Sequence, residues 1–187
     1  MIAVIGPQDK NKYKDFYFVN TTSTSKEEWS RGLSPFFLGP IPLYSNLMAE
    51  NLENAWQFAK VYPNQVKDDK IIRKYYDWAL KGWADKRAHR YPMGRGAIPL
   101  FSLWKKQRLS YIEARKEIYM PLYKEAVVKT EAYKKLVEIY KEHRNIVLFD
   151  FDGYDYLGMN KNLDEVLNDP KKKMGHAFVL AMLLSEI

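Results

Sequence analysis

Apolar residues recur along most of this chain at the three- and four-residue steps of amphipathic helices. This periodicity predicts six helices, over Leu47–Val61, Asp69–Arg90, Leu109–Tyr119, Leu122–Val128, Glu131–Glu142 and Met174–Ser185. Three prolines agree with these boundaries. Pro63 and Pro92 follow predicted helix ends, and Pro121 should kink or restart a helix because proline lacks the backbone N–H.

Short runs of branched and aromatic residues predict strands over Phe16–Val19 and Ile146–Phe149, with Ile2–Ile5 as a third candidate. Residues 20–46 are rich in Thr, Ser, Gly and Pro with interspersed aromatic residues, which is typical of a long functional loop. We see no internal repeat and no linker. The pattern therefore predicts an α+β, predominantly helical fold, with residues 1–187 forming a single compact domain of helices around a small sheet.

Composition limits the class of protein. Apolar residues make up 47% of the chain and aromatic residues 15%, which is enough to bury a core. The absence of cysteine excludes disulfides and cysteine-based metal sites. The apolar run at the N-terminus is too short for a signal peptide, and no run approaches the length of a membrane span. We therefore expect a cytoplasmic protein that does not associate with membranes.

The net charge of +7 bears on possible partners. A basic surface favours a polyanion or a phosphorylated ligand. The basic residues are spread along the chain, however, and a merely solvated basic surface explains the same composition. Both interpretations stay open at this point.

The segment IVLFDFDGYD places Asp150 and Asp152 directly after a predicted strand, as in haloacid-dehalogenase-type phosphatases. That enzyme class carries the motif early, with a parallel α/β domain after it, whereas only about 35 residues follow here. Tyr154 also replaces the usual threonine. A phosphatase of this class is therefore disfavoured, and so is a calcium loop, because no ligand pattern ending in glutamate follows.

Other common sites are missing from the sequence. The histidines His89, His143 and His176 are far apart and lack metal-ligand spacing, so we expect no metal site and interpret them as caps or surface residues. Gly94-Arg95-Gly96 is too small to be a dinucleotide or phosphate-loop fingerprint. A G-x-S-x-G nucleophile motif is absent.

One polar pattern survives this screening, in ENLENAWQFAK, residues 50–60. Glu53, Gln57 and Lys60 repeat at helical spacing, and their mean direction lies roughly 110° from the apolar stripe that Trp56 belongs to. The row lies at the border of the predicted buried face. A surface ladder, meaning a row of side-chain contacts along an exposed helix face, would explain this position, and so would the wall of a cleft.

The surrounding sequence resembles the NADAR family, named for its association with NAD and ADP-ribose metabolism. Residues 35–60, PFFLGPIPLYSNLMAENLENAWQFAK, are similar to its motif of an apolar-aromatic lead, a turn and then Glu, Gln and Lys. Glu53, Gln57 and Lys60 match that spacing in full, whereas the family's histidine after the glutamate is Asn54 here.

Further segments follow in the family's order, so that the resemblance covers residues 17–187. Met120 and Lys124 match a Met and a Lys of a long helical segment, with Glu125 in place of phenylalanine. FDGYDYLGMN lies where the family has an aspartate signature, and MGHAFVLAMLL resembles its closing helix. Asp155 and Gly158 fit the signature best, with Leu157 in place of tryptophan; Asp150 and Asp152 stay open as alternatives for the aspartate.

The resemblance implies an N-glycosidase that cleaves the bond between ribose C1′ and a nitrogen, without a cofactor or metal. The implied substrates are ADP-ribosylated bases and phosphorylated nucleotide-like molecules. A carboxylate must then stabilise an oxocarbenium-like sugar or activate water, and Glu53 is the first choice. Asp155 or its neighbour Asp152 would be the second acid.

The remaining roles concern substrate binding. Lys60 and Arg95 are expected to hold phosphate, and Gln57 to orient a ribose hydroxyl or the base edge. Aromatic side chains of the long loop are candidates for stacking on the base, with core packing as the alternative. These aromatic residues are Trp29, Phe36, Phe37 and Tyr44.

Two other functions stay open. The departures at Asn54, Glu125 and Leu157 would suit a non-catalytic binder of nucleotide, ADP-ribose or nucleic acid. A DNA glycosylase acting on modified bases would break the same kind of bond after base flipping, with DNA as the partner.

Overall fold

Three short apolar strands form a parallel sheet in the computed structural model, which describes residues 1–187. The central strand β10 (Ile146–Phe149) lies between β1 (Ile2–Ile5) and β2 (Tyr17–Asn20). Every residue of β1 and β10 is buried, as expected for parallel strands covered on both faces. All three predicted strands are confirmed, with β2 starting and ending one residue later than predicted.

The chain divides into two compact units. Unit 1 comprises Met1–Phe37 and Tyr123–Ile187, and contains the parallel sheet; unit 2 comprises Leu38–Leu122. Helices and strands occur in both units, which confirms the α+β class. The expected single small sheet is wrong, because the strands form four small sheets. The number of domains stays a prediction.

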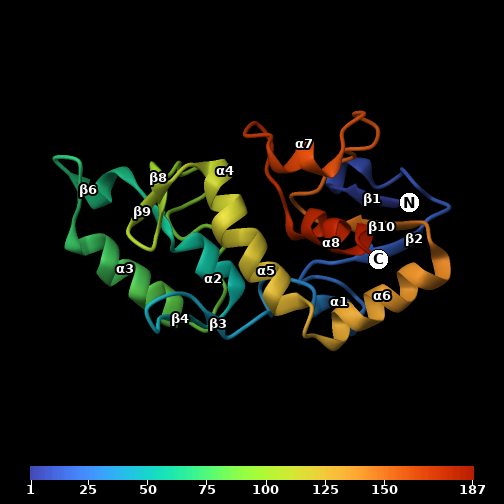
Figure 1. Cartoon of the computed structure of the whole chain (residues 1–187), viewed down its shortest axis with the longest axis horizontal. Coiled ribbons are helices and arrows are strands. Elements are labelled where there is room, and N and C mark those ends of the chain that lie inside the picture. Colours follow the sequence, from blue (N-terminus) through green and yellow to red (C-terminus); the bar gives the residue numbers. More distant parts are fainter. The chain divides into compact units, whose positions relative to one another are not determined.

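The helices of unit 1 pack against its sheet and each other. Helix α8 (His176–Ser185) lies against β1 and β10, and α1 (Glu28–Arg31) lies against α6 (Glu131–His143) (Figure 1). Helix α7 (Leu163–Leu167) contacts α8. Helix α8 is buried on most of its surface. None of the helices has the length and apolar character that a membrane span requires.

Unit 2 is built from very short strands and three helices. The helices are α2 (Leu52–Gln57), α3 (Arg73–Ala84) and α4 (Tyr111–Ala114). The strands form a three-stranded antiparallel sheet, β5-β8-β9, and two hairpins, β3-β4 and β6-β7. Their bounds are β3 Ile41–Pro42, β4 Met48–Ala49, β5 Lys60–Val61, β6 Val66–Lys67, β7 Lys70–Ile71, β8 Phe101–Trp104 and β9 Gln107–Leu109.

The prediction of one helix over Leu47–Val61 is wrong in its extent. The helix α2 begins after Asn51, whose side chain accepts the backbone N–H of Asn54 and caps the helix. It ends at Gln57, and the chain continues into β5 at Lys60. The predicted helix over residues 69–90 is likewise shortened to α3, because residues 66–71 form the β6-β7 hairpin.

The two helices predicted on either side of Pro121 are one helical run. It passes from α4 through a π-helical segment, Arg115–Tyr119, into α5 (Met120–Val127). Pro121 cannot donate to the carbonyl one turn before it, and its ring would crowd that carbonyl. A wider π turn just before the proline accommodates both effects, so the proline neither breaks nor restarts the helix.

Close packing fixes the C-terminal end of α2 against α3. Gly82 lies on α3, and a Cβ atom added to it would come within 2.1 Å of the ring of Phe58, the residue that caps α2. That ring is buried and also packs against Trp78 at 4.6 Å between ring centroids. A glycine is therefore required here for the two helices to approach each other.

We expect Gly82→Ala to destabilise the protein by about 1–3 kcal/mol, because the added methyl group overpacks a filled site. The sign of this stability change is informative, since a glycine-to-alanine change at an uncrowded helix position stabilises a protein by about 0.5–1 kcal/mol. Urea unfolding followed by circular dichroism measures it. The exposed neighbour Lys81→Ala is the control and should change stability by less than about 0.5 kcal/mol.

Candidate functional site

The polar row at α2 is a chain of hydrogen bonds. The Gln57 side-chain amide donates from Nε2 to Glu53 Oε1 at 2.9 Å, and Lys60 Nζ donates to Gln57 Oε1 at 2.9 Å. Glu53 is 7% exposed and Gln57 9% exposed. Glu53 and Gln57 therefore lie inside the fold and Lys60 is half-buried, so an exposed surface ladder does not describe the row.

The chemistry of Lys60 fixes the orientation of the amide between the two charged groups. An ammonium group can only donate, so the amide oxygen of Gln57 must face Lys60. The amide NH₂ then faces Glu53 and donates to it. Gln57 thus connects a carboxylate and a cation at fixed positions, although Lys60 is on strand β5 and not on the helix.

Aromatic side chains lie next to one end of the row in unit 2. The ammonium of Lys60 lies 4.9 Å from the ring centre of Trp56, and that ring packs against Tyr119 at 5.2 Å. Tyr44 packs edge-on against Trp104 at 4.8 Å and belongs to the same apolar cluster as Trp56. Of the loop aromatics expected to stack on a base, Tyr44 is thus the one that this cluster contains.

Asn54, which replaces the histidine of the resembled family, is fully buried and ties α2 to the loop after α3. Its Nδ2 donates to the carbonyls of Asp85 and Arg87 at 2.9 and 2.8 Å, and its Oδ1 accepts the N–H of His89 at 2.8 Å. His89 in turn bonds the Asp85 carboxylate at 2.7 Å. The asparagine thus has a structural role beside Glu53.

Arg95 has a different environment from the row. It lies in the exposed loop between α3 and β8, where its guanidinium packs over the Tyr91 ring at 5.4 Å, as does that of Arg90. Gly94 and Gly96 on either side have φ values of +94° and +86°. The hydrogen-bonded row does not include Arg95, so its phosphate-binding role stays a prediction.

Asp155 belongs to unit 1 and is held by several donors. Its Oδ1 accepts Tyr13 Oη at 2.6 Å and the N–H of Gly158 at 2.8 Å, and Oδ2 accepts Lys12 Nζ at 2.8 Å. Burial alone would raise its pKa, but the bonds from Lys12, Tyr13 and Gly158 outweigh burial and lower the pKa. The carboxylate thus links the N-terminal segment to residues 155–158.

The other predicted site residues of unit 1 have separate local contacts. Trp29 bonds Glu27 through its indole N–H and lies under Lys135, with the ammonium 4.8 Å from the ring centre. Phe36 is half-buried next to Ser34, and Phe37 is 60% exposed. Asp152 lies near Lys173 at 3.9 Å, and its backbone N–H donates to Asp150. Their roles in binding or catalysis stay predictions.

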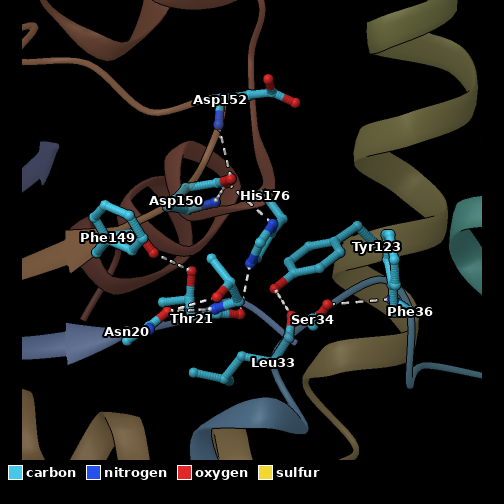
Figure 2. Close-up of polar contacts among 12 residues, drawn as sticks. Asn20, Thr21, Leu33, Ser34, Phe36, Tyr123, Phe149, Asp150, Asp152 and His176 are labelled. Carbon is cyan, nitrogen blue, oxygen red and sulfur yellow. Dashed lines mark hydrogen bonds and ion pairs between the residues drawn. The ribbon is translucent and has the colours of Figure 1, made fainter. Parts of the chain in front are cut away.

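A buried ion pair that sequence reasoning missed lies at the end of the parallel sheet. His176 Nδ1 and Asp150 Oδ2 are 3.0 Å apart, and both residues are less than a tenth exposed. His176 Nε2 lies 2.8 Å from the carbonyl oxygen of Thr21. Figure 2 shows the imidazole between Asp150 and Thr21, with the Tyr123 hydroxyl donating to Leu33 beside it.

The partners of His176 determine its protonation state. A carbonyl oxygen only accepts, so Nε2 must carry a proton. Asp150 accepts backbone N–H groups from Ala177 and Asp152, each at 3.1 Å, in addition to His176. Burial would raise the pKa of Asp150, but the charge and hydrogen bond of His176 and these two N–H groups lower it to about 2. When both members of the pair are charged, both histidine nitrogens donate to oxygen acceptors.

This protonation state limits the chemistry of the pair. An imidazolium with both N–H groups bonded has no lone pair for proton abstraction or for a metal. The Asp150 carboxylate is likewise occupied, and Gly175 must be a glycine because a Cβ there would lie 2.1 Å from Asp150 Oδ2. The pair joins the ends of β10 and β2 to the start of α8. The interpretation of His176 as a surface residue or cap is wrong.

Replacing Asn54 with Asp tests its structural role. The change keeps the shape but replaces a two-proton donor with a carboxylate facing two carbonyls, so we expect a loss of about 2–4 kcal/mol. Thermal unfolding of the variant measures the loss. Asn64→Asp, at an exposed position of the same unit, is the control, and equal losses in both variants would contradict the role.

The ion pair predicts a specific acid dependence of stability. Because the folded pKa of Asp150 lies below its usual value of 3.8, its contribution is present above about pH 4 and is lost as the pH falls toward 2. This group should account for about 2 kcal/mol of that loss. Urea unfolding from pH 7 to pH 2 measures it.

Asp150→Asn should lower the free energy of unfolding by about 3–5 kcal/mol at pH 7, because it leaves a buried imidazolium without its counter-ion. It should also flatten the acid branch, which is the loss of stability as the pH falls from about 4 toward 2. Asp15→Asn, at an exposed position of the same unit, should leave the acid branch unchanged. An acid branch that is equally steep in Asp150→Asn and in the native protein would rule out the ion pair as its source.

Comparison with known proteins adds one finding about the chain as a whole. Residues 8–180 match a family of unknown function, DUF6939. No solved structure matches the chain. The resemblance to the NADAR family stays a prediction.

Proposed function

We propose that this chain, which belongs to the DUF6939 family of unknown function, is an N-glycoside hydrolase acting on a nucleotide-like or ADP-ribosylated substrate. The observation that carries the proposal is the hydrogen-bonded row of Glu53, Gln57 and Lys60. A buried carboxylate with a fixed orientation, next to a cation and to aromatic rings, offers the groups that cleavage of a ribosyl–nitrogen bond needs.

The reaction breaks the bond between C1′ of the ribose and a nitrogen of the base. The bonding electron pair leaves with that nitrogen, which takes up a proton, and C1′ becomes electron-deficient. Water then adds its oxygen to C1′ and gives up a proton. Glu53 stabilises the positive charge at C1′ or accepts the proton of water. Hydrolysis of this kind consumes only water and needs no cofactor.

The neighbouring groups would bind the substrate. Lys60 is a point charge that suits a phosphate, and the Trp56 ring beneath it limits where the ammonium can lie. Gln57 would exchange one of its internal bonds for a ribose hydroxyl or a base edge. Tyr44, in the same apolar cluster, would offer a ring for stacking.

A second function is supported by the state of Asp155. Its carboxylate already accepts Lys12, Tyr13 and Gly158, which does not favour it as an acid that exchanges protons with a substrate. If cleavage requires a second acid, a chain in which Asp155 stays bonded to these donors would be a binder of nucleotides or ADP-ribose rather than a hydrolase. Such a binder would be thermally stabilised by the ligand without forming product.

The test is incubation of the purified chain with ADP-ribosylated guanosine and with phosphorylated ribosyl-pyrimidines, followed by chromatography for the free base and sugar. Glu53→Gln keeps the side-chain shape and an acceptor for Gln57 but removes the negative charge. We expect it to lower kcat by about 10²–10³-fold, because the charge stabilises the transition state.

Glu50→Gln is the matched control, because Glu50 is an exposed glutamate three residues before Glu53, and its activity should equal that of the native chain. Turnover that Glu53→Gln leaves intact would show that the catalytic assignment is wrong. Ligand-induced stabilisation without any product would favour the binder instead.

A further inference from the structure

The excess positive charge of the chain lies entirely in unit 2. Residues 38–122 contain 15 lysines and arginines and 8 acids, whereas unit 1 contains 15 of each. The net charge of +7 is thus a property of one unit, and the other is neutral. This concentration of positive charge in one unit favours an anionic partner for unit 2.

The basic residues concentrate at the tips of two hairpins. The β6-β7 tip reads Lys67-Asp68-Asp69-Lys70. The β8-β9 turn is Lys105-Lys106, and Gln107 and Arg108 follow it as the first residues of β9; all eight residues are exposed. Arg108 Nη1 donates to Asp69 Oδ1 at 2.9 Å, and Nη2 donates to the Asp69 carbonyl. Because this contact joins the two tips, we call residues 67–70 and 105–108 together the hairpin-tip surface.

The hairpin-tip surface keeps several unfavourable local features. Lys67 lies directly opposite Lys70 in the ladder, where like charges repel. Lys105 and Lys106 have φ values of 48° and 66°, in the left-handed region where a two-residue hairpin turn favours Asn-Gly. Two adjacent lysines at such positions are strained and electrostatically unfavourable in the isolated protein.

The cations of this surface are available to a partner. Lys67, Lys70, Lys105 and Lys106 make no ion pair within the chain. Arg108 is oriented by Asp69 on one side and by the ring of Phe101, 4.6 Å from its guanidinium carbon. The two acids at the β6-β7 tip leave the surface with a net charge of +3.

We propose that the hairpin-tip surface binds the phosphodiester backbone of a nucleic acid. Lysines and an oriented arginine on an exposed, two-hairpin surface suit a row of phosphates. An anionic membrane is the less suitable partner, because membrane-bound surfaces also bury apolar side chains and both tips carry only polar ones. The proposal is independent of the glycosidase chemistry.

The test measures fluorescence anisotropy with labelled duplex DNA, single-stranded DNA and single-stranded RNA between 50 and 300 mM KCl, salt values chosen around the physiological range of about 150 mM. We expect Lys105→Gln/Lys106→Gln to weaken duplex binding about tenfold at 100 mM salt. For this double variant, the slope of log K for duplex binding against log salt concentration should be smaller in magnitude than that of the native protein by about 1.8, since two phosphate contacts are lost. Comparison of the three probes identifies the preferred polymer.

Two further variants make the result specific. Lys14→Gln/Lys26→Gln removes the same charge from exposed positions of unit 1 and should change affinity less than about twofold. Lys105→Asn/Lys106→Gly removes the same two charges while giving the turn its preferred residues. It should lose binding as Lys105→Gln/Lys106→Gln does, with an unchanged or higher Tm, so that unfolding cannot explain the loss.

Three outcomes would overturn the proposal: equal losses in the unit 1 and unit 2 variants, no salt-dependent binding to any of the three probes, or binding to phosphatidylserine vesicles but not to nucleic acid. Hydrolysis of a free nucleotide-like substrate, measured on the same variants, separates the two proposals. The hairpin-tip variants should retain it, whereas Glu53→Gln should keep nucleic-acid binding.

Discussion

The ion pair of Asp150 and His176 holds together the part of unit 1 on which its sheet depends. A carboxylate and an imidazolium buried inside a protein each cost several kcal/mol of desolvation, which is offset only when the two are paired and fully hydrogen-bonded. Here the two side chains and three backbone groups satisfy one another across the ends of β10, β2 and α8. The strand ends and the start of the helix therefore have to meet in one arrangement, which fixes how α8 covers the sheet.

The same requirement shapes unit 2 around the polar row. Asn54 satisfies three backbone groups of the loop after α3, and its neighbour Glu53 is bonded to Gln57. The amide of Asn54 uses both of its N–H protons and its oxygen on backbone groups, whereas Glu53 brings a negative charge into the same short helix. That difference distinguishes a side chain that supports α2 from one suited to chemistry, although both are buried on the same short helix.

The two proposals use separate features of unit 2. The hydrolase proposal depends on a largely buried row with fixed orientation. The nucleic-acid proposal depends on exposed cations, which are four lysines without an ion pair and Arg108, which Asp69 orients. A charged group does chemistry best when its surroundings are arranged in advance, whereas backbone binding works through many exposed and exchangeable contacts. Placing both in the unit with the +7 charge would bring an anionic substrate toward the row, since a field of one sign raises the local concentration of its counter-charge.

The sequence by itself determined the α+β class, the three strands of the parallel sheet and the spacing of Glu53, Gln57 and Lys60. These follow from residue period and from local propensity, which act over a few positions. The sequence pattern overestimated the length of α2, because helical periodicity continues to Lys60. In the structure the cap at Asn51 and the pairing of β5 with β8 limit the helix. Strands of two residues, such as β6 and β7, carry no periodic signal at all.

Only the tertiary structure decided the partners of the isolated residues. His176 and Asp150 are 26 positions apart, and Asn54 and His89 are 35 apart, so no local pattern relates them. The same holds for charge: the sequence showed +7 spread along the chain, and the division into two units showed that one of them carries it all. The physical reason is that hydrogen bonds and electrostatic fields depend on distance in space, whereas a sequence records only order along the chain.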